Sequence, residues 1–243
     1  MKLLAFETAT EACSVALWID GEVSERFEVA PRRHAELSLP WAEALLADAG
    51  VARAQLDALA VSRGPGAFTG VRLGISLVQG IALALDRPVV TVSTLAVLAA
   101  GAPAVGDAER GVLASIDARM GEVYAGAFAV RGGDAIALGH EIVGAATSVE
   151  LPEGHAGWHG AGTGFAAGDG ALARHLAGRI GPVDATALPR AADLARLAVR
   201  AAERGELVAP ERVEPAYLRN NVALTITEQQ ALRDSRSTGK AGA

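Results

Sequence analysis

The 243-residue sequence contains a single cysteine, Cys13. It can therefore form neither an intramolecular disulfide nor a cysteine-based zinc cluster, and it suits a reducing compartment. Aromatic residues make up only 4% of the chain and hydrophobic residues 51%, so we expect a core built mainly from Ala, Val and Leu. This apolar content, with 21% charged residues, excludes an intrinsically disordered protein.

Lysine is nearly absent, because Lys2 and Lys240 are the only two, and the formal net charge is −6. Proteins that hold nucleic acid unaided neutralise its phosphates with Lys and Arg. The composition therefore argues against independent nucleic-acid binding, although it leaves room for a local basic patch.

Long hydrophobic runs are also scarce. Residues 1–6 are too short for the apolar region of a signal peptide, and Glu7 ends them. The longest uncharged stretch, residues 88–106, has about the length of a membrane span but contains prolines, serine, threonines and glycines, so it predicts a buried strand followed by a short helix. We expect a soluble, cytoplasmic protein.

The order of predicted elements repeats along the chain. Short apolar runs predict strands at residues 2–6, 13–19, 23–29, 56–62 and 88–92, and helical periodicity predicts helices at 34–49, with Pro40 kinking it or marking a late start, and at 68–85. Strands at residues 111–117, 122–130 and 135–143 and a helix at 191–204 follow. A shift of 110 residues places Asp117 on Glu7, which indicates an internal duplication.

A duplicated three-stranded meander with helical crossovers is typical of the actin-like ATPase superfamily. We therefore predict an α/β protein with two ribonuclease-H-like domains, each a mixed sheet flanked by helices. The predicted domains are residues 1–106 and 107–224, and residues 225–243 form a polar tail that we expect to be disordered.

The most distinctive segment is Arg-Gly-Pro-Gly-Ala-Phe-Thr-Gly-Val-Arg-Leu-Gly at residues 63–74. A strand ends there, a glycine turn follows and a helix begins. This arrangement is typical of an anion-binding site but equally of a tight turn with close packing. The segment does not contain a Walker motif. Gly66, Gly70 and Gly74 are spaced by four, and glycine inside a helix costs roughly 1 kcal/mol. Close packing of these glycines, either against the chain's own sheet or against a helix of a partner, should offset that cost.

Two other groups are candidates for chemistry. Glu7, Thr8 and Thr10 lie in the turn where sugar kinases hold phosphate and magnesium, but no glycine is there, so the turn predicts either a degenerate nucleotide site or an ordinary hairpin. His155 and His159 have the His-x-x-x-His spacing of metal ligands, but the interleaved glycines disfavour a helix. We predict no metal site and no catalytic residue.

Five segments resemble one family. They are residues 3–17, the first helix from His34 to Pro40, the glycine motif at 64–74, residues 117–124 (Asp-Ala-Arg-Met-Gly-Glu-Val-Tyr) and residues 215–220 (Pro-Ala-Tyr-Leu-Arg-Asn). In this order they are similar to the bacterial tRNA threonylcarbamoyladenosine biosynthesis proteins called TsaB or YeaZ. Glu7 departs from the Asp that is common there, which further weakens phosphate binding.

The resemblance implies a non-catalytic protein without cofactors. It supports a catalytic paralogue, TsaD, which transfers a threonylcarbamoyl group to the adenosine next to the anticodon of tRNA. It also implies contact with the ATPase TsaE through the complex, tRNA binding only through the complex, and a homodimer when alone as an option. The metal-binding His-x-x-x-His of the paralogue is replaced here by Thr94 and Leu98.

The same resemblance places the partner surface on the two first helices and favours the partner-helix interpretation of the glycines. The predicted interface residues are His34, Leu37, Trp41, Leu45, Gly70, Leu73, Gly74 and Leu77.

Two other classes of protein compete with this interpretation. An active small-molecule kinase needs a tight ATP–Mg site, and a protease needs a nucleophile or metal constellation that the sequence does not offer.

Overall fold

The computed structural model describes residues 1–103, 109–155 and 157–219, so the predicted tail at 225–243 lies outside the described residues. The first sheet has the strand order β3-β2-β1-β4-β5. Its strands are β1 (Lys2–Glu7), β2 (Ala12–Ile19), β3 (Glu22–Val29), β4 (Ala58–Ser62) and β5 (Val89–Val92). The antiparallel meander β1-β2-β3 continues through the parallel pairs β1–β4 and β4–β5, so the sheet is mixed.

The second sheet repeats this plan with the order β8-β7-β6-β10-β11, and β9 also pairs with β7. Its strands are β6 (Arg110–Arg119), β7 (Glu122–Arg131), β8 (Asp134–Ala137), β9 (Ile142–Ala145), β10 (Trp158–Ala161) and β11 (Ile180–Asp184). Here too an antiparallel meander is extended by two parallel pairs. The duplication and the fold class predicted from the sequence are thereby confirmed.

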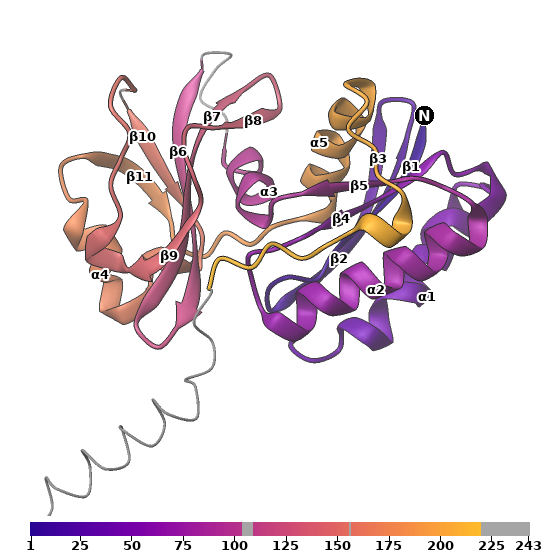
Figure 1. Ribbon diagram of the computed structural model, residues 1–243, viewed down its shortest axis with the longest axis horizontal. Coiled ribbons are helices and arrows are strands. Elements are labelled where there is room, and N and C mark those ends of the chain that lie inside the picture. Colours follow the sequence, from indigo (N-terminus) through magenta and orange to yellow (C-terminus); the bar gives the residue numbers. More distant parts are fainter. Residues whose placement is uncertain (104–108, 156, 220–243) are drawn as a thin grey trace, which may run out of the picture.

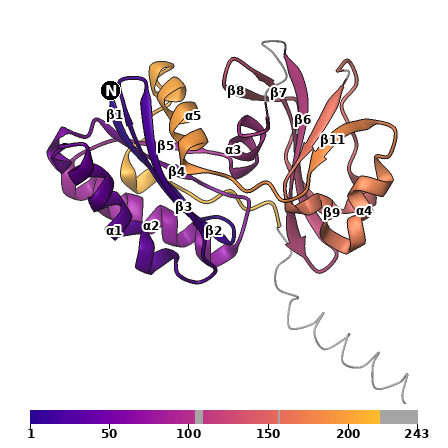
Figure 2. The ribbon, with the colours of Figure 1, turned by 180° about the vertical axis from the view of Figure 1, so that it is seen from behind.

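Helices cover both faces of the sheets (Figures 1 and 2). They are α1 (His34–Asp48), α2 (Phe68–Leu85), α3 (Thr94–Ala100), α4 (Ala167–His175) and α5 (Ala191–Glu203). The outer face of the first sheet carries α1 and α2, and the outer face of the second carries α4. Between the sheets lie α3 and α5, which share one apolar core with both inner faces.

Polar side chains of the first sheet hold the start of α5, although this helix follows the second sheet in the chain. Ser14 Oγ accepts the N–H of Ala191 at 2.9 Å, and Glu25 accepts the N–H of Ala192 at 3.0 Å and forms an ion pair with Arg190. These bonds replace a local N-cap, because Arg190 offers none. A helix within the predicted domain 107–224 therefore packs on the first sheet, and the predicted domain bounds remain a prediction.

One local expectation was wrong, and one of the two alternatives for Pro40 is excluded. The predicted strand at residues 135–143 is divided into β8 and β9, because residues 138–141 stand opposite only two residues of β7. The surplus residues bulge away from the ladder. The first helix begins at His34, well before Pro40, so this proline does not mark a late start.

The long helix α2 is apolar enough to span a membrane by length and composition alone. Instead it packs on the first sheet as a core helix, with Val71, Ile75 and Val78 buried. The uncharged stretch that resembled a span contains β5 and α3, as predicted.

Candidate functional site

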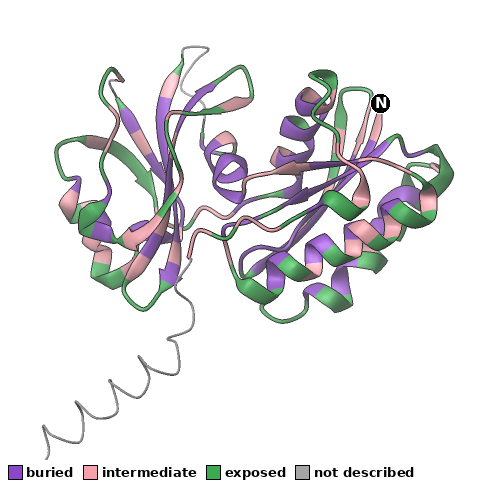
Figure 3. Ribbon diagram, viewed as in Figure 1, coloured by how far each residue is buried: buried purple, intermediate pink, exposed green. Residues whose placement is uncertain are grey.

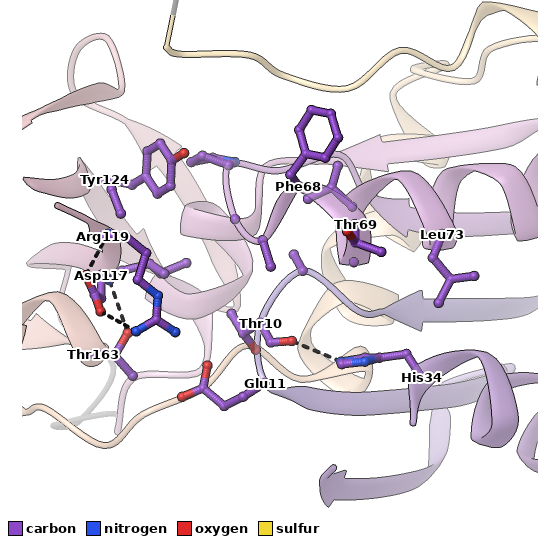
Figure 4. Close-up of a pocket in the computed structure, with 18 of the residues that line it drawn as sticks. Thr10, Glu11, His34, Phe68, Thr69, Leu73, Asp117, Arg119, Tyr124 and Thr163 are labelled. Carbon is purple, nitrogen blue, oxygen red and sulfur yellow. Dashed lines mark hydrogen bonds and ion pairs between the residues drawn. The ribbon is translucent and has the colours of Figure 1, made fainter. Parts of the chain in front are cut away.

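A cleft of about 830 Å³ lies between the two sheets, where β1, β4 and β6 end (Figure 4). Thr10 and Glu11 line it from the β1–β2 turn, and the start of α2 lines it with Phe68 and Thr69. From the second sheet come Asp117, Arg119, Tyr124 and Thr163. The cleft is therefore built by the turns that the sequence singled out in each half.

The glycines spaced by four, Gly66, Gly70 and Gly74, pack against the chain's own β1–β2 turn. A Cβ atom on Gly70 would lie 2.1 Å from the carbonyl oxygen of Thr8, and one on Gly74 would lie 2.5 Å from Thr8 Oγ1. Gly66 approaches the Ala9 carbonyl as closely, and Ala67 N donates to that oxygen at 2.7 Å. Intramolecular packing, the alternative that the sequence left open, thus accounts for the glycines, and their spacing does not point to a partner helix.

Glu7 is fully buried and does not line the cleft. Its Oε1 accepts the N–H of Ala9 at 2.8 Å, while Oε2 has no hydrogen-bond partner in the described part of the chain. Burial raises the pKa of Glu7 to about 7, and the hydrogen bond from Ala9 only partly opposes this. A carboxyl group in this setting cannot serve as an exposed magnesium ligand.

The threonines of the predicted nucleotide turn are also engaged within the chain. Thr8 Oγ1 donates to the carbonyl of Gly70 at 2.8 Å. Thr10 Oγ1 accepts from Ala12 N at 3.4 Å, and the carbonyl of Thr10 lies 2.9 Å from His34 Nε2. The arrangement does not support the predicted degenerate nucleotide site, because Glu7 and Thr8 present no group to the cleft.

Most of the predicted interface residues are buried within the chain itself. These are His34, Leu37, Leu45, Gly70 and Gly74. His34 holds the β1–β2 turn through the carbonyls of Thr10 and Ala12, and Leu45 belongs to the core under α1. These residues are part of the packing beneath the outer surface of α1 and α2 and are not themselves available to a partner. Only Trp41, Leu73 and Leu77 of the predicted set are partly exposed.

Buried, partly buried and exposed positions alternate along α2 (Figure 3), and a second apolar row of this helix is only partly buried. Leu73, Leu77, Ile81 and Leu85 follow one another at the i, i+4 spacing along α2, and all are only partly buried. Beside them an apolar groove of about 380 Å³ separates α1 from α2, bordered by Leu39, Gly80 and Ala84. Sequence reasoning missed the second half of this stripe and the groove. The signal for it was a second apolar row, Leu73, Leu77, Ile81 and Leu85, beside the row of α2 that is buried on the sheet, since each apolar row of a helix needs cover.

A C-terminal strap, residues 205–219, was also missed. It runs from the end of α5 along α2 to the cleft (Figure 1). Gln79 Nε2 donates to the carbonyl of Pro210 at 3.0 Å, and Ala216 N donates to the carbonyl of Arg63 at 2.8 Å. Arg219 then reaches the β6–β7 turn, where it forms an ion pair with Glu122. The strap has no periodic pattern, so its sequence offered only the motif at residues 215–220.

The described residues include no group of three or more His, Cys, Asp or Glu side chains that could hold a metal ion. His159 is part of β10, and His155 Nδ1 lies 4.0 Å from Glu109 Oε1. Thr94 begins α3, and its Oγ1 is buried without a partner among those residues.

Comparisons with known proteins give the family. The family model of TsaD, tRNA N6-adenosine threonylcarbamoyltransferase, matches residues 27–226. The tRNA threonylcarbamoyladenosine biosynthesis protein TsaB of Escherichia coli is 43% identical over 92% of this chain and 96% of its own length. The chain belongs to the TsaB family.

Further matches agree with the TsaB assignment. The TsaB of Haemophilus influenzae is 48% identical over 51% of this chain and 52% of its own length. The crystal structure of YeaZ from Pseudomonas aeruginosa is 46% identical and superimposes with a TM-score of 0.82, covering 89% of this chain and 99% of that one. The chain is thus a TsaB-family protein of tRNA threonylcarbamoyladenosine biosynthesis, as its motifs predicted.

Proposed function

We propose that this chain is a non-catalytic subunit that binds the catalytic paralogue TsaD and supports its threonylcarbamoyl transfer to the adenosine next to the anticodon. One observation carries the proposal. The stripe of Leu73, Leu77, Ile81 and Leu85 is only partly buried, and together with the adjoining groove it leaves apolar surface of α1 and α2 accessible. Such a surface marks a protein–protein contact.

The occupant we propose is the corresponding helix pair of the paralogue. Helices with apolar i, i+4 rows pack ridges into grooves, and a groove between two helices accepts a ridge from a third. Arg53 and Glu43 border the groove and pair with each other at 2.6 Å, which leaves its floor free of unpaired charge. Through this contact the chain would meet TsaE and tRNA only within the complex. A second copy would occupy the same surface in the absence of TsaD.

The state of the cleft supports a role without chemistry. The carboxyl group of Glu7 is buried, the Thr8 hydroxyl is bonded to α2, and Asp117 accepts the backbone N–H and the guanidinium of Arg119. An active kinase, the competing function, needs these positions free for phosphate and magnesium. We place the protein in the cytoplasm, where the tRNA that TsaD would modify is made.

A matched pair of substitutions tests the contact. Ala84 is exposed and borders the groove, so Ala84→Asp brings a charge into the proposed interface at little cost to the free chain. We expect association with TsaD to weaken by more than about a hundredfold, because an uncompensated buried charge costs about 3 kcal/mol or more. Calorimetric titration measures the affinity, and thermal melting of the free variant checks its fold.

The control is Ala177→Asp, the same change at an exposed residue that follows α4 on the second sheet. It should leave the affinity unchanged. Equal affinities of the two variants for TsaD would show that the surface of α1 and α2 is not the contact with TsaD.

A further inference from the structure

Exposed aromatic and basic side chains gather at the start of α2, at the opposite end of this helix from the groove beside α1. Phe68 and Tyr217 are 62% and 52% exposed and line the cleft where the strap passes the start of α2. Met120, 88% exposed, lies on the β6–β7 turn, where its sulfur is 3.8 Å from Arg219. We call Phe68, Arg72, Met120, Tyr217 and Arg219 the mouth patch.

Arg72 organises the mouth patch. Its guanidinium carbon lies 3.4 Å from the centre of the Phe68 ring and 5.2 Å from that of Tyr217. The two rings are 6.5 Å apart and inclined by 33°. Across the described ranges the Arg72 side chain makes no hydrogen bond or ion pair. The N–H donors of its guanidinium therefore stay available, while the contact with the rings limits the movement of the group. A guanidinium held over an aromatic ring, with its N–H donors free, is preorganised to bind a phosphate or carboxylate.

The surroundings add to the positive potential. The first turn of α2 contains no acidic residue and no side-chain cap, so the N-terminal end of the helix dipole is not neutralised. Arg32 lines the same cleft and is exposed, and like Arg72 it has no ion-pair partner among the residues described. Glu11 and Asp117 line the cleft as well, but Asp117 is paired with Arg119, so among the described residues Arg32 and Arg72 face one carboxylate without an ion-pair partner, Glu11.

We infer that the mouth patch is a contact for single-stranded RNA, and specifically for unpaired nucleotides of the tRNA that the complex modifies. The choice of RNA over an acidic peptide rests on the combination of flat, exposed rings with a stacked guanidinium. Bases stack on such rings whatever their sequence, and the guanidinium binds the neighbouring phosphate. The inference rests on the proposed function, since one patch of this size holds RNA usefully only beside a larger binding surface.

The assembled complex with TsaD provides the test. Tyr217→Ala removes a stacking ring, and we expect the affinity for tRNA to fall by about five- to a hundredfold, the range given by the loss of one stacked base. Arg72→Gln removes a phosphate contact, so the slope of log K against log salt should decrease in magnitude by about 0.7. Arg179→Gln, at an exposed arginine that pairs with Glu150 behind the second sheet, is the control and should change neither quantity.

The outcomes separate RNA binding from protein binding. If Tyr217→Ala and Arg72→Gln leave the tRNA affinity and its salt dependence unchanged while the complex assembles normally, the inference is wrong. It is also wrong if both variants lose TsaD instead, because the mouth patch would then be a protein contact.

A second measurement does not depend on TsaD. A single-stranded RNA oligonucleotide, cross-linked by ultraviolet light to the free chain at high concentration, should attach to peptides that contain Tyr217 or Phe68. Cross-links elsewhere only would overturn the inference. If the free chain cross-links there but TsaD neither binds the chain nor requires it, the proposed function fails and the RNA contact stands.

Discussion

At the scale of single residues, the polar groups of the β1–β2 turn are used within the chain and not in the cleft. Glu7 ends β1 in the core, and Thr8 bonds to the carbonyl of Gly70. The sequence revealed that an acid and two threonines stand in this turn. It could not reveal that α2 approaches the turn so closely, because this follows from packing over a distance of some sixty residues.

The burial of Glu7 predicts a pH-dependent stability. Its pKa is about 7 in the folded chain against an ordinary value of 4.5, so the folded state binds the proton more tightly than the unfolded state. The free energy of unfolding should therefore fall as the pH rises from about 4.5 to 7, by up to about 3 kcal/mol, and stay level above. Glu7→Gln cannot ionise and should remove this dependence.

Denaturant unfolding of both proteins at pH 5 and pH 8 measures the effect. The variant should be the more stable of the two at pH 8, with the difference largely lost at pH 5. Parallel changes in the two proteins between these pH values would show that Glu7 is not the titrating group.

At the scale of elements, α2 shows what spacing can and cannot reveal. The helix bounds 68–85 were predicted as they occur, because the apolar period and the glycine turn are local signals. Gly70 and Gly74 were correctly recognised as sites of close approach, but the approaching group is the β1–β2 turn. The groove depends on where α1 lies beside α2, which no local pattern encodes.

Two glycines of the same helix give opposite predictions. Gly70→Ala places a methyl group against the Thr8 carbonyl, which is backbone and cannot easily move, so we expect a loss of about 1–3 kcal/mol or more. A methyl group on Gly80 would meet no atom within 4 Å, so Gly80→Ala should stabilise the free chain by up to about 1 kcal/mol. Thermal melting of the two variants compares them directly. A similar change of melting temperature in both variants would show that Gly70 is not packed against the β1–β2 turn as described.

At the scale of the whole molecule, two copies of one strand plan enclose a cleft, and the contacts we propose lie on α1 and α2 and at the mouth of this cleft. The inner faces of both sheets share a core with α3 and α5, while α1 and α2 stand on an outer face with an apolar stripe half exposed. The strap joins the start of α2 to the β6–β7 turn. Duplication was readable in the sequence, whereas the return of α5 and the strap to the first sheet was not, because both depend on contacts between distant segments.

The most direct test of the central claim is the rate of threonylcarbamoyladenosine formation by TsaD as this chain is added. The rate should rise as the chain is added and should saturate when the two proteins are fully bound to each other. Ala84→Asp should shift the curve to higher concentrations and reach the same plateau, because the substitution affects binding alone. Glu7→Gln and Asp117→Asn should keep the plateau within about twofold. A plateau lowered by a hundredfold or more in either carboxyl variant, with TsaD binding intact, would show that this chain contributes chemistry and would contradict the account.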